Sequence, residues 1–84
     1  MKTAKEMFEE LGYECDIGSD GILYAKYIDL KDDVAICHID FDKVNKTIEK
    51  DVSRAMFDVK HYNSKITLVE YMAIHKQMEE LGWL

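Results

Sequence analysis

The sequence predicts a small α+β domain: an N-terminal helix, a three- or four-stranded antiparallel β-meander and a C-terminal helix, with both helices on one face of the sheet. Two observations lead to this prediction. A helix-ending phrase occurs near both ends of the chain, as MFEELGY at residues 7–13 and MEELGW at residues 78–83. The residues between them are rich in β-branched and aromatic side chains. Helices that flank a run of strands are typical of the α+β class.

The N-terminal helix has a start signal and a stop signal. Thr3 and Glu6 form a capping-box pattern, in which each side chain accepts a hydrogen bond from the other residue's backbone N–H. Gly12 stands where a residue of positive φ ends a helix, and we expect Tyr13 to fold back onto Phe8. The predicted buried stripe has helical spacing and consists of Ala4, Met7, Phe8 and Leu11.

The C-terminal helix repeats both signals. Thr67 and Glu70 form a second capping box, and Gly82 supplies a second stop, which should bring Trp83 against Met78. The repeated phrase is therefore two helix ends and not a duplicated unit. The predicted buried stripe is Tyr71, Ile74, Met78 and Leu81.

Strands are predicted at residues 21–29, 33–42 and 45–52, and the short LKDD segment indicates a tight antiparallel connection between the first two. Residues 55–62 alternate less clearly, so the meander has three strands without them and four with them. Without proline or a low-complexity linker, residues 1–84 are interpreted as one domain.

A sheet covered on one face should alternate apolar and polar residues. Strand 33–42 does so, and its predicted core set is Ala35, Cys37, Ile39 and Phe41. Strand 21–29 is apolar on both faces; we assign Leu23, Ala25 and Tyr27 to the core and Ile22, Tyr24, Lys26 and Ile28 to the open face.

The open face is the candidate protein-binding site, because tyrosine and aliphatic side chains on a rigid sheet are typical of interface centres. Its predicted members are Tyr24, Ile28 and Ile36 as apolar anchors, with His38, Asp40 and Asp42 as polar contacts. An alternative acidic surface lies in the last turns of the two helices, where the helix dipole disfavours carboxylates. It consists of Glu9, Glu10, Glu79 and Glu80.

Patterns that carry catalysis are weak, so we expect no enzyme, no metal and no cofactor. His38, Asp40 and Asp42 are spaced two residues apart on one strand, but no fourth metal ligand is marked. Cys37 and His38 are adjacent and point to opposite faces, which excludes a catalytic pair. The DIGSDG segment at residues 16–21 lacks two ligands of a calcium loop and is interpreted as a turn.

The net charge of −6 is polarised along the chain. Acidic residues dominate residues 1–42, whereas lysines and one arginine gather between Lys43 and Lys65 among interrupting acids. This balance argues against nucleic-acid binding and favours a basic protein partner. The first residues lack a signal-peptide core, and two cysteines are too few for a disulfide scaffold, so we expect a cytoplasmic protein.

The segments TAKEMFEELGYE and ITLVEYMAIHKQMEELGWL resemble the ends of small uncharacterised phage and prophage proteins of Gram-positive bacteria. The resemblance covers both helices and brings no known active site with it. It implies a non-enzymatic accessory protein, located in the host cytoplasm, that binds and modulates a host or phage protein, for example by presenting an acidic, nucleic-acid-like surface. The alternative is an assembly protein that forms a homodimer through the open sheet face.

Overall fold

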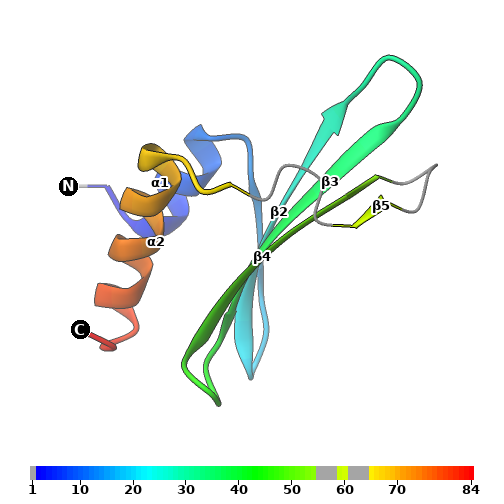
Figure 1. The fold of residues 1–84 in the computed structure, drawn as a ribbon. Coiled ribbons are helices and arrows are strands. Elements are labelled where there is room, and N and C mark those ends of the chain that lie inside the picture. Colours follow the sequence, from blue (N-terminus) through cyan, green and yellow to red (C-terminus); the bar gives the residue numbers. More distant parts are fainter. Residues whose placement is uncertain (1, 55–58, 61–64) are drawn as a thin grey trace.

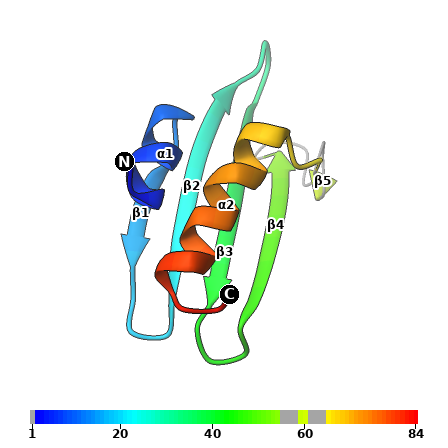
Figure 2. The ribbon, with the colours of Figure 1, turned by 90° about the vertical axis from the view of Figure 1, so that its left-hand side faces the viewer.

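The structure is a computed structural model that describes residues 2–54, 59–60 and 65–84. Its elements, in chain order, are α1 (Ala4–Glu10), β1 (Glu14–Ile17), β2 (Gly21–Asp29), β3 (Val34–Asp42), β4 (Thr47–Arg54), β5 (Val59–Lys60) and α2 (Leu68–Glu80). Each strand pairs antiparallel with the next, so the sheet is a meander of order β1-β2-β3-β4-β5. Figures 1 and 2 show both helices on one face of this sheet, which confirms the predicted α+β architecture.

The strand boundaries differ from the prediction in two places. β1 was not predicted, because a four-residue strand is too short to show alternation and forms only by pairing with β2. β4 begins and ends two residues later than the predicted 45–52, because the Asp42 side chain accepts hydrogen bonds from the backbone N–H groups of Val44 and Asn45 and holds them in a turn. Of the predicted strand at 55–62, residues 59 and 60 form β5, and the others lie outside the described residues.

Both helices begin and end as predicted. The two capping boxes are formed in full, Thr3 with Glu6 and Thr67 with Glu70. Gly12 and Gly82 have φ of 94° and 75°. The residue after each glycine donates its backbone N–H to a carbonyl five residues back, over 3.0 Å in both helices, which is the Schellman arrangement.

The core lies between the helices and one face of β2 to β4. Tyr24 is its centre: only 1% of its surface is exposed, and its ring stacks on Phe8 with 3.9 Å between centroids. Phe41 meets both of these rings edge-on. The predicted core set of β3 is confirmed, because its four members are all buried.

The predicted faces of β2 were wrong. Tyr24 pairs with Ile39, and Ile22 with Phe41, so the even-numbered residues of β2 face the helices and Leu23, Ala25 and Tyr27 face away. The hairpin explains why: Leu30 and Asp33 exchange backbone hydrogen bonds around a two-residue loop. Across such a loop, an odd-numbered residue always pairs with an even-numbered one.

The buried stripe of α2 also differs from the prediction. Ile74 is buried and Met78 and Leu81 pack against the core as expected, but Tyr71 is half-exposed, and Glu70 and Gln77 are buried instead. Neither helix is long and apolar enough to span a membrane, judged over the residues that the structure describes.

Candidate functional site: the open face of the sheet

The open face, which is the face of β1–β4 opposite the helices, carries a dense set of carboxylates. The strand register aligns Asp16, Leu23, Asp40 and Glu49 in one cross-strand row, and Glu14, Ala25, His38 and Asp51 in the next. Two further acids lie at the adjoining turns. The acidic patch, as we call it, consists of Glu14, Asp16, Asp20, Asp40, Asp42, Glu49 and Asp51. No lysine or arginine of β1 to β4 points to this face.

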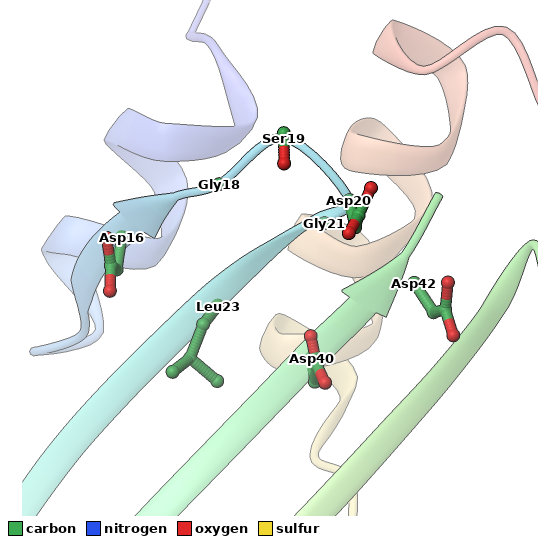
Figure 3. Close-up of a pocket in the computed structure, with 8 residues that line it drawn as sticks. All are labelled: Asp16, Gly18, Ser19, Asp20, Gly21, Leu23, Asp40 and Asp42. Carbon is green, nitrogen blue, oxygen red and sulfur yellow. The ribbon is translucent and has the colours of Figure 1, made fainter. Parts of the chain in front are cut away.

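Part of the patch surrounds a shallow hollow of about 450 Å³ at the turn end of the sheet. Figure 3 shows Leu23 between Asp16 and Asp40, with the helices on the far side of the strands. Gly21 allows β2 to approach β3 closely here, because a Cβ at this position would lie 2.5 Å from the Phe41 carbonyl oxygen. The hollow is lined by Asp16, Gly18, Ser19, Asp20, Gly21, Leu23, Asp40 and Asp42.

Hydrogen bonds at the β3–β4 turn favour the charged form of Asp42, and two other acids of the patch repel each other. The Asn45 side chain and the backbone N–H groups of Asn45 and Val44 donate to Asp42, and these hydrogen bonds lower the pKa of its carboxyl. Asp40 and Glu49 stand directly opposite each other on neighbouring strands. Like charges in that position destabilise a sheet. The chain therefore keeps a charge pair that folding alone disfavours, which is typical of functional surfaces.

The acids are not arranged as a metal site. Among the described residues, no group of three or more histidine, cysteine or acidic side chains is placed to hold a metal ion. His38, Asp40 and Asp42 share the open face, but neighbours of the same face are ~6.6–6.8 Å apart along a strand, and both Asp42 oxygens accept hydrogen bonds within the turn. Cys37 is buried on the helix side, opposite His38.

The predicted binding residues fall on different faces. Ile36, His38, Asp40 and Asp42 lie on the open face as expected. Tyr24 and Ile28 face the helices, so their assignment as apolar anchors was wrong.

Among the described residues of β2 and β3, Tyr27 supplies an aromatic side chain to the open face. It is 62% exposed and pairs directly with Ile36. The open face is thus acidic near the β1–β2 and β3–β4 turns, and near the β2–β3 hairpin it carries Tyr27 and Ile36 together with Asp29.

The alternative acidic surface at the helix ends is largely occupied by contacts within the protein. Glu80 accepts a hydrogen bond of 2.8 Å from the backbone N–H of Ala4, so it caps the start of α1. Glu10 pairs with Lys2 over 2.7 Å, and Glu79 with His75 over 3.0 Å. Three of the four predicted acids therefore have partners within the protein, and Glu9 is exposed.

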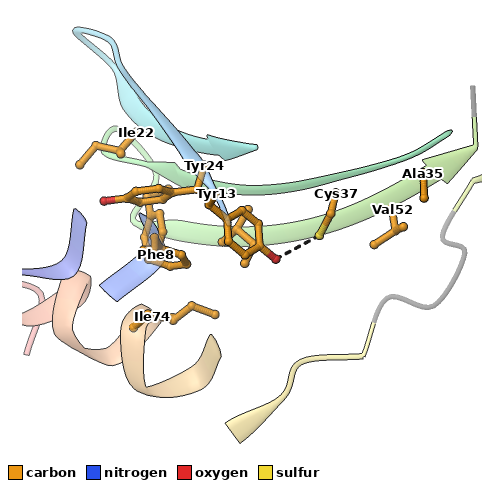
Figure 4. Packing of buried hydrophobic residues seen from close by; sticks show 11 residues of the cluster. Phe8, Tyr13, Ile22, Tyr24, Ala35, Cys37, Val52 and Ile74 are labelled. Carbon is orange, nitrogen blue, oxygen red and sulfur yellow. Dashed lines mark hydrogen bonds between the residues drawn. The ribbon is translucent and has the colours of Figure 1, made fainter. Parts of the chain in front are cut away.

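A polar cluster joins both layers behind the open face. The Glu70 carboxylate accepts from the Tyr13 hydroxyl at 2.5 Å, from the Lys50 ammonium at 2.9 Å and from the Thr67 backbone N–H at 3.0 Å. Burial raises the pKa of Glu70, but these hydrogen bonds outweigh burial and lower the pKa to about 2. Tyr13 gives its only proton to Glu70, so the Cys37 thiol donates to the tyrosine oxygen at 3.2 Å (Figure 4).

The fold and the site define a small α+β protein with helices on one face of a meander and carboxylates on the other. No protein-family model, curated protein or solved structure matches this chain.

Proposed function

We propose that this protein is a non-enzymatic binding module that uses the open face to bind and modulate a basic protein. The observation that carries the proposal is the acidic patch: seven carboxylates gather on the open face of β1–β4 and at its adjoining turns, and no lysine or arginine of those strands points to that face. Such a surface attracts basic partners over long range and repels nucleic acids and anionic membranes. In keeping with the resemblance of the chain ends to phage proteins, the partner belongs to a phage or its bacterial host.

The charge density of the patch supports a nucleic-acid-binding protein as the partner class. Along one strand, acids on the same face recur every ~6.6–6.8 Å. β3 and β4 each contribute two such acids, which lie at three levels ~6.6–6.8 Å apart along the strands, because Asp40 and Glu49 are directly opposite each other. One strand of DNA carries a phosphate every ~3.4 Å. A basic groove that binds a phosphate strand would therefore meet a row of negative charges here at about every second phosphate position.

Tyr27 and Ile36 complete the proposed interface. Tyr27 is exposed and pairs with Ile36, which lies on the central strand β3, between β2 and β4. Aromatic side chains on a rigid support are common hot spots, because they supply contact area at a low entropic cost. Long-range attraction comes from the acids, and we expect Tyr27 to supply the buried centre.

A homodimer through the open face is disfavoured by the same charges. Two copies placed face to face would bring acidic patches together without a lysine or arginine of β1–β4 between them. Like charges at an interface cost several kcal/mol.

The proposal is tested by displacement of DNA. A fluorescent duplex is bound to purified DNA-binding proteins of a Gram-positive host, and its release by this protein is followed by polarisation. We expect the double variant Asp40→Asn/Glu49→Gln to need at least ~10-fold more protein for half-release, and the wild type to weaken steeply with salt. The control Glu9→Gln/Asp32→Asn removes the same charge from exposed positions elsewhere. Equal loss in both double variants would show a net-charge effect and contradict the proposal, as would no release by the wild type.

A further inference from the structure

The outer side of α2 is apolar where a solvent-facing helix should be polar. The start of the helix and the residue before its cap expose five large hydrophobic side chains within seven residues, with Leu68 exposed to 75%. They are half of the ten large hydrophobic side chains that are exposed in the described part of the chain, so the exposure is concentrated. These residues, which we call the apolar helix patch, are Ile66, Leu68, Val69, Tyr71 and Met72.

Met72 lies between two hollows in the helix layer. One has a volume of about 350 Å³ and lies between Met7 of α1 and the stretch of α2 from Tyr71 to Glu79. The other, of about 180 Å³, is bounded by Met7, Leu11, Val69 and Met72. Hollows of this kind, on both sides of Met72, can receive side chains of a second helix. A contiguous apolar surface on a small protein marks an interaction site.

We propose that a second copy of this chain covers the apolar helix patch, with the two α2 helices antiparallel and Met72 near the two-fold axis. On the outer side of α2, Leu68 and Val69 lie four and three residues before Met72, and His75 and Lys76 lie three and four residues after it, so these positions are symmetric about Met72. Around such an axis, Leu68 faces the partner's Lys76 and Val69 faces the partner's His75. The apolar stem of the lysine covers the leucine.

The charges around the apolar helix patch favour an antiparallel dimer over a parallel dimer or a lipid surface. Lys65 lies two residues before the N-cap of α2, and Glu79 lies in the last turn of the helix. Antiparallel α2 helices therefore bring opposite charges together at both ends, whereas parallel helices would bring like charges together. A lipid surface is a poorer match, because the protein has a net charge of −6 and the rim of the hollows has no excess of bases: Lys2 and Lys76 are balanced by Glu10 and Glu79. A self-complementary surface is what a two-fold dimer requires.

The size of the patch sets the expected affinity. α2 has 13 residues and is ~20 Å long, and a layer of two helices is about as wide. Each copy would cover an area of roughly 400 Å², about half of the ~800 Å² per partner in a standard interface. We therefore expect a reversible dimer with a Kd in the micromolar range or weaker, and both acidic patches would remain exposed on opposite sides of it.

Sedimentation equilibrium from about 10 μM to 1 mM protein measures the dimer directly, in a range that brackets the expected Kd. We expect the mass to rise from that of a monomer toward twice that value. Met72→Glu and Leu68→Glu should each raise the Kd at least ~10-fold while the circular dichroism is retained, since both side chains are more than half exposed. The matched control is Val44→Glu, because Val44 is 71% exposed on the β3–β4 turn and lies outside the patch; it should leave the Kd unchanged.

A charge exchange tests the antiparallel register and does not depend on the patch variants being folded. Glu79→Lys and Lys65→Glu should each weaken the dimer, and the double variant should restore it, because opposite charges again meet. A wild type that stays monomeric at 1 mM overturns the proposal, and binding of that monomer to phosphatidylcholine vesicles would assign the patch to a lipid surface. The proposal is also contradicted if Met72→Glu and Leu68→Glu leave the Kd of the dimer unchanged. It is contradicted as well if the Glu79→Lys/Lys65→Glu variant dimerises no more tightly than either single variant.

Discussion

Replacement of Glu70 by glutamine should strongly destabilise the protein, because the Glu70 carboxylate is the buried centre of a polar cluster. The Glu70 carboxylate holds together α2, β4 and the start of β1 through Lys50 and Tyr13. The side chains of Lys50 and Glu70 are only 8% and 6% exposed. Glutamine has the same size, so the variant removes the charge and leaves the Lys50 ammonium buried without its counter-ion.

The magnitude follows from the pKa of Glu70, which is about 2 in the folded protein instead of the ordinary 4.5. By linkage, a pKa difference of this size contributes about 3 kcal/mol to the free energy of unfolding at neutral pH. Breaking a buried ion pair by removing one partner costs a similar ~3–5 kcal/mol. In a domain of this length, 3 kcal/mol lowers the Tm by ~12–24 °C.

The pH dependence of this effect has a definite sign. A lowered folded-state pKa means that the stability from ionised Glu70 is present in full above the unfolded-state value near 4.5 and is lost as the pH falls toward 2. The difference in Tm between the wild type and Glu70→Gln should therefore shrink from pH 7 to pH 3. Thermal unfolding followed by circular dichroism at several pH values measures it.

Two further variants separate the ion pair from other effects of the substitution. Glu79→Gln on the same helix is the control, because its carboxylate is about half exposed and pairs with His75 at the surface; it should change stability by less than ~1 kcal/mol. Adding Lys50→Met to Glu70→Gln should recover part of the loss, since it removes the uncompensated charge. A Glu70→Gln protein within ~4 °C of the wild type at pH 7 would refute the reasoning, as would a deficit that does not change with pH.

Three other predictions concern the caps, the acidic patch and the core. Gly82→Ala should cost ~1 kcal/mol in urea unfolding through its φ of 75° alone, because an added Cβ would meet no atom within 4 Å; an unchanged midpoint would contradict the Schellman assignment. Asp40→Asn should raise stability by ~0.2–1 kcal/mol by relieving the repulsion from Glu49, and a loss of stability would show that the pair is not repulsive. Tyr24→Ala should cost ~3–5 kcal/mol, whereas Ile36→Ser should keep the helical circular dichroism; the reverse pattern would invalidate the face assignment.

The helix ends were predictable because their signals are local. Thr3 and Glu6 are close in sequence, and Gly12 alone determines whether the chain can turn back after α1. The core set of β3 was predictable for a similar reason, since that strand alternates without ambiguity. Local chemistry of this kind needs no knowledge of the remaining chain.

The faces of the strands were predicted incorrectly or not at all where they depend on how one strand pairs with the next. β2 is apolar on both sides, and only the two-residue loop at its end determines which side meets Ala35. That information was present in the short LKDD segment, through the rule that odd and even positions pair across a two-residue loop. Four of the seven acids could not be identified in the same way, because they reach the open face only through the registers of β1 and β4: Glu14, Asp16, Glu49 and Asp51.

Burial of Glu70 was equally inaccessible from local sequence. Its position in a capping box predicts an exposed first turn, and a carboxylate is seldom buried without partners. Its partners Tyr13 and Lys50 lie 57 and 20 residues away. Only the assembled fold brings them together.

The hydrogen bond from the Ala4 backbone to Glu80 has a consequence for the order of folding. It joins residues 76 positions apart, and α1, with seven residues, is too short to be stable in isolation. We therefore expect the hairpins of the sheet to form early, within microseconds of their loops closing, and α1 to form only after α2 has docked. In refolding experiments, the final part of the helical signal, contributed by α1, would then mark the last step of folding.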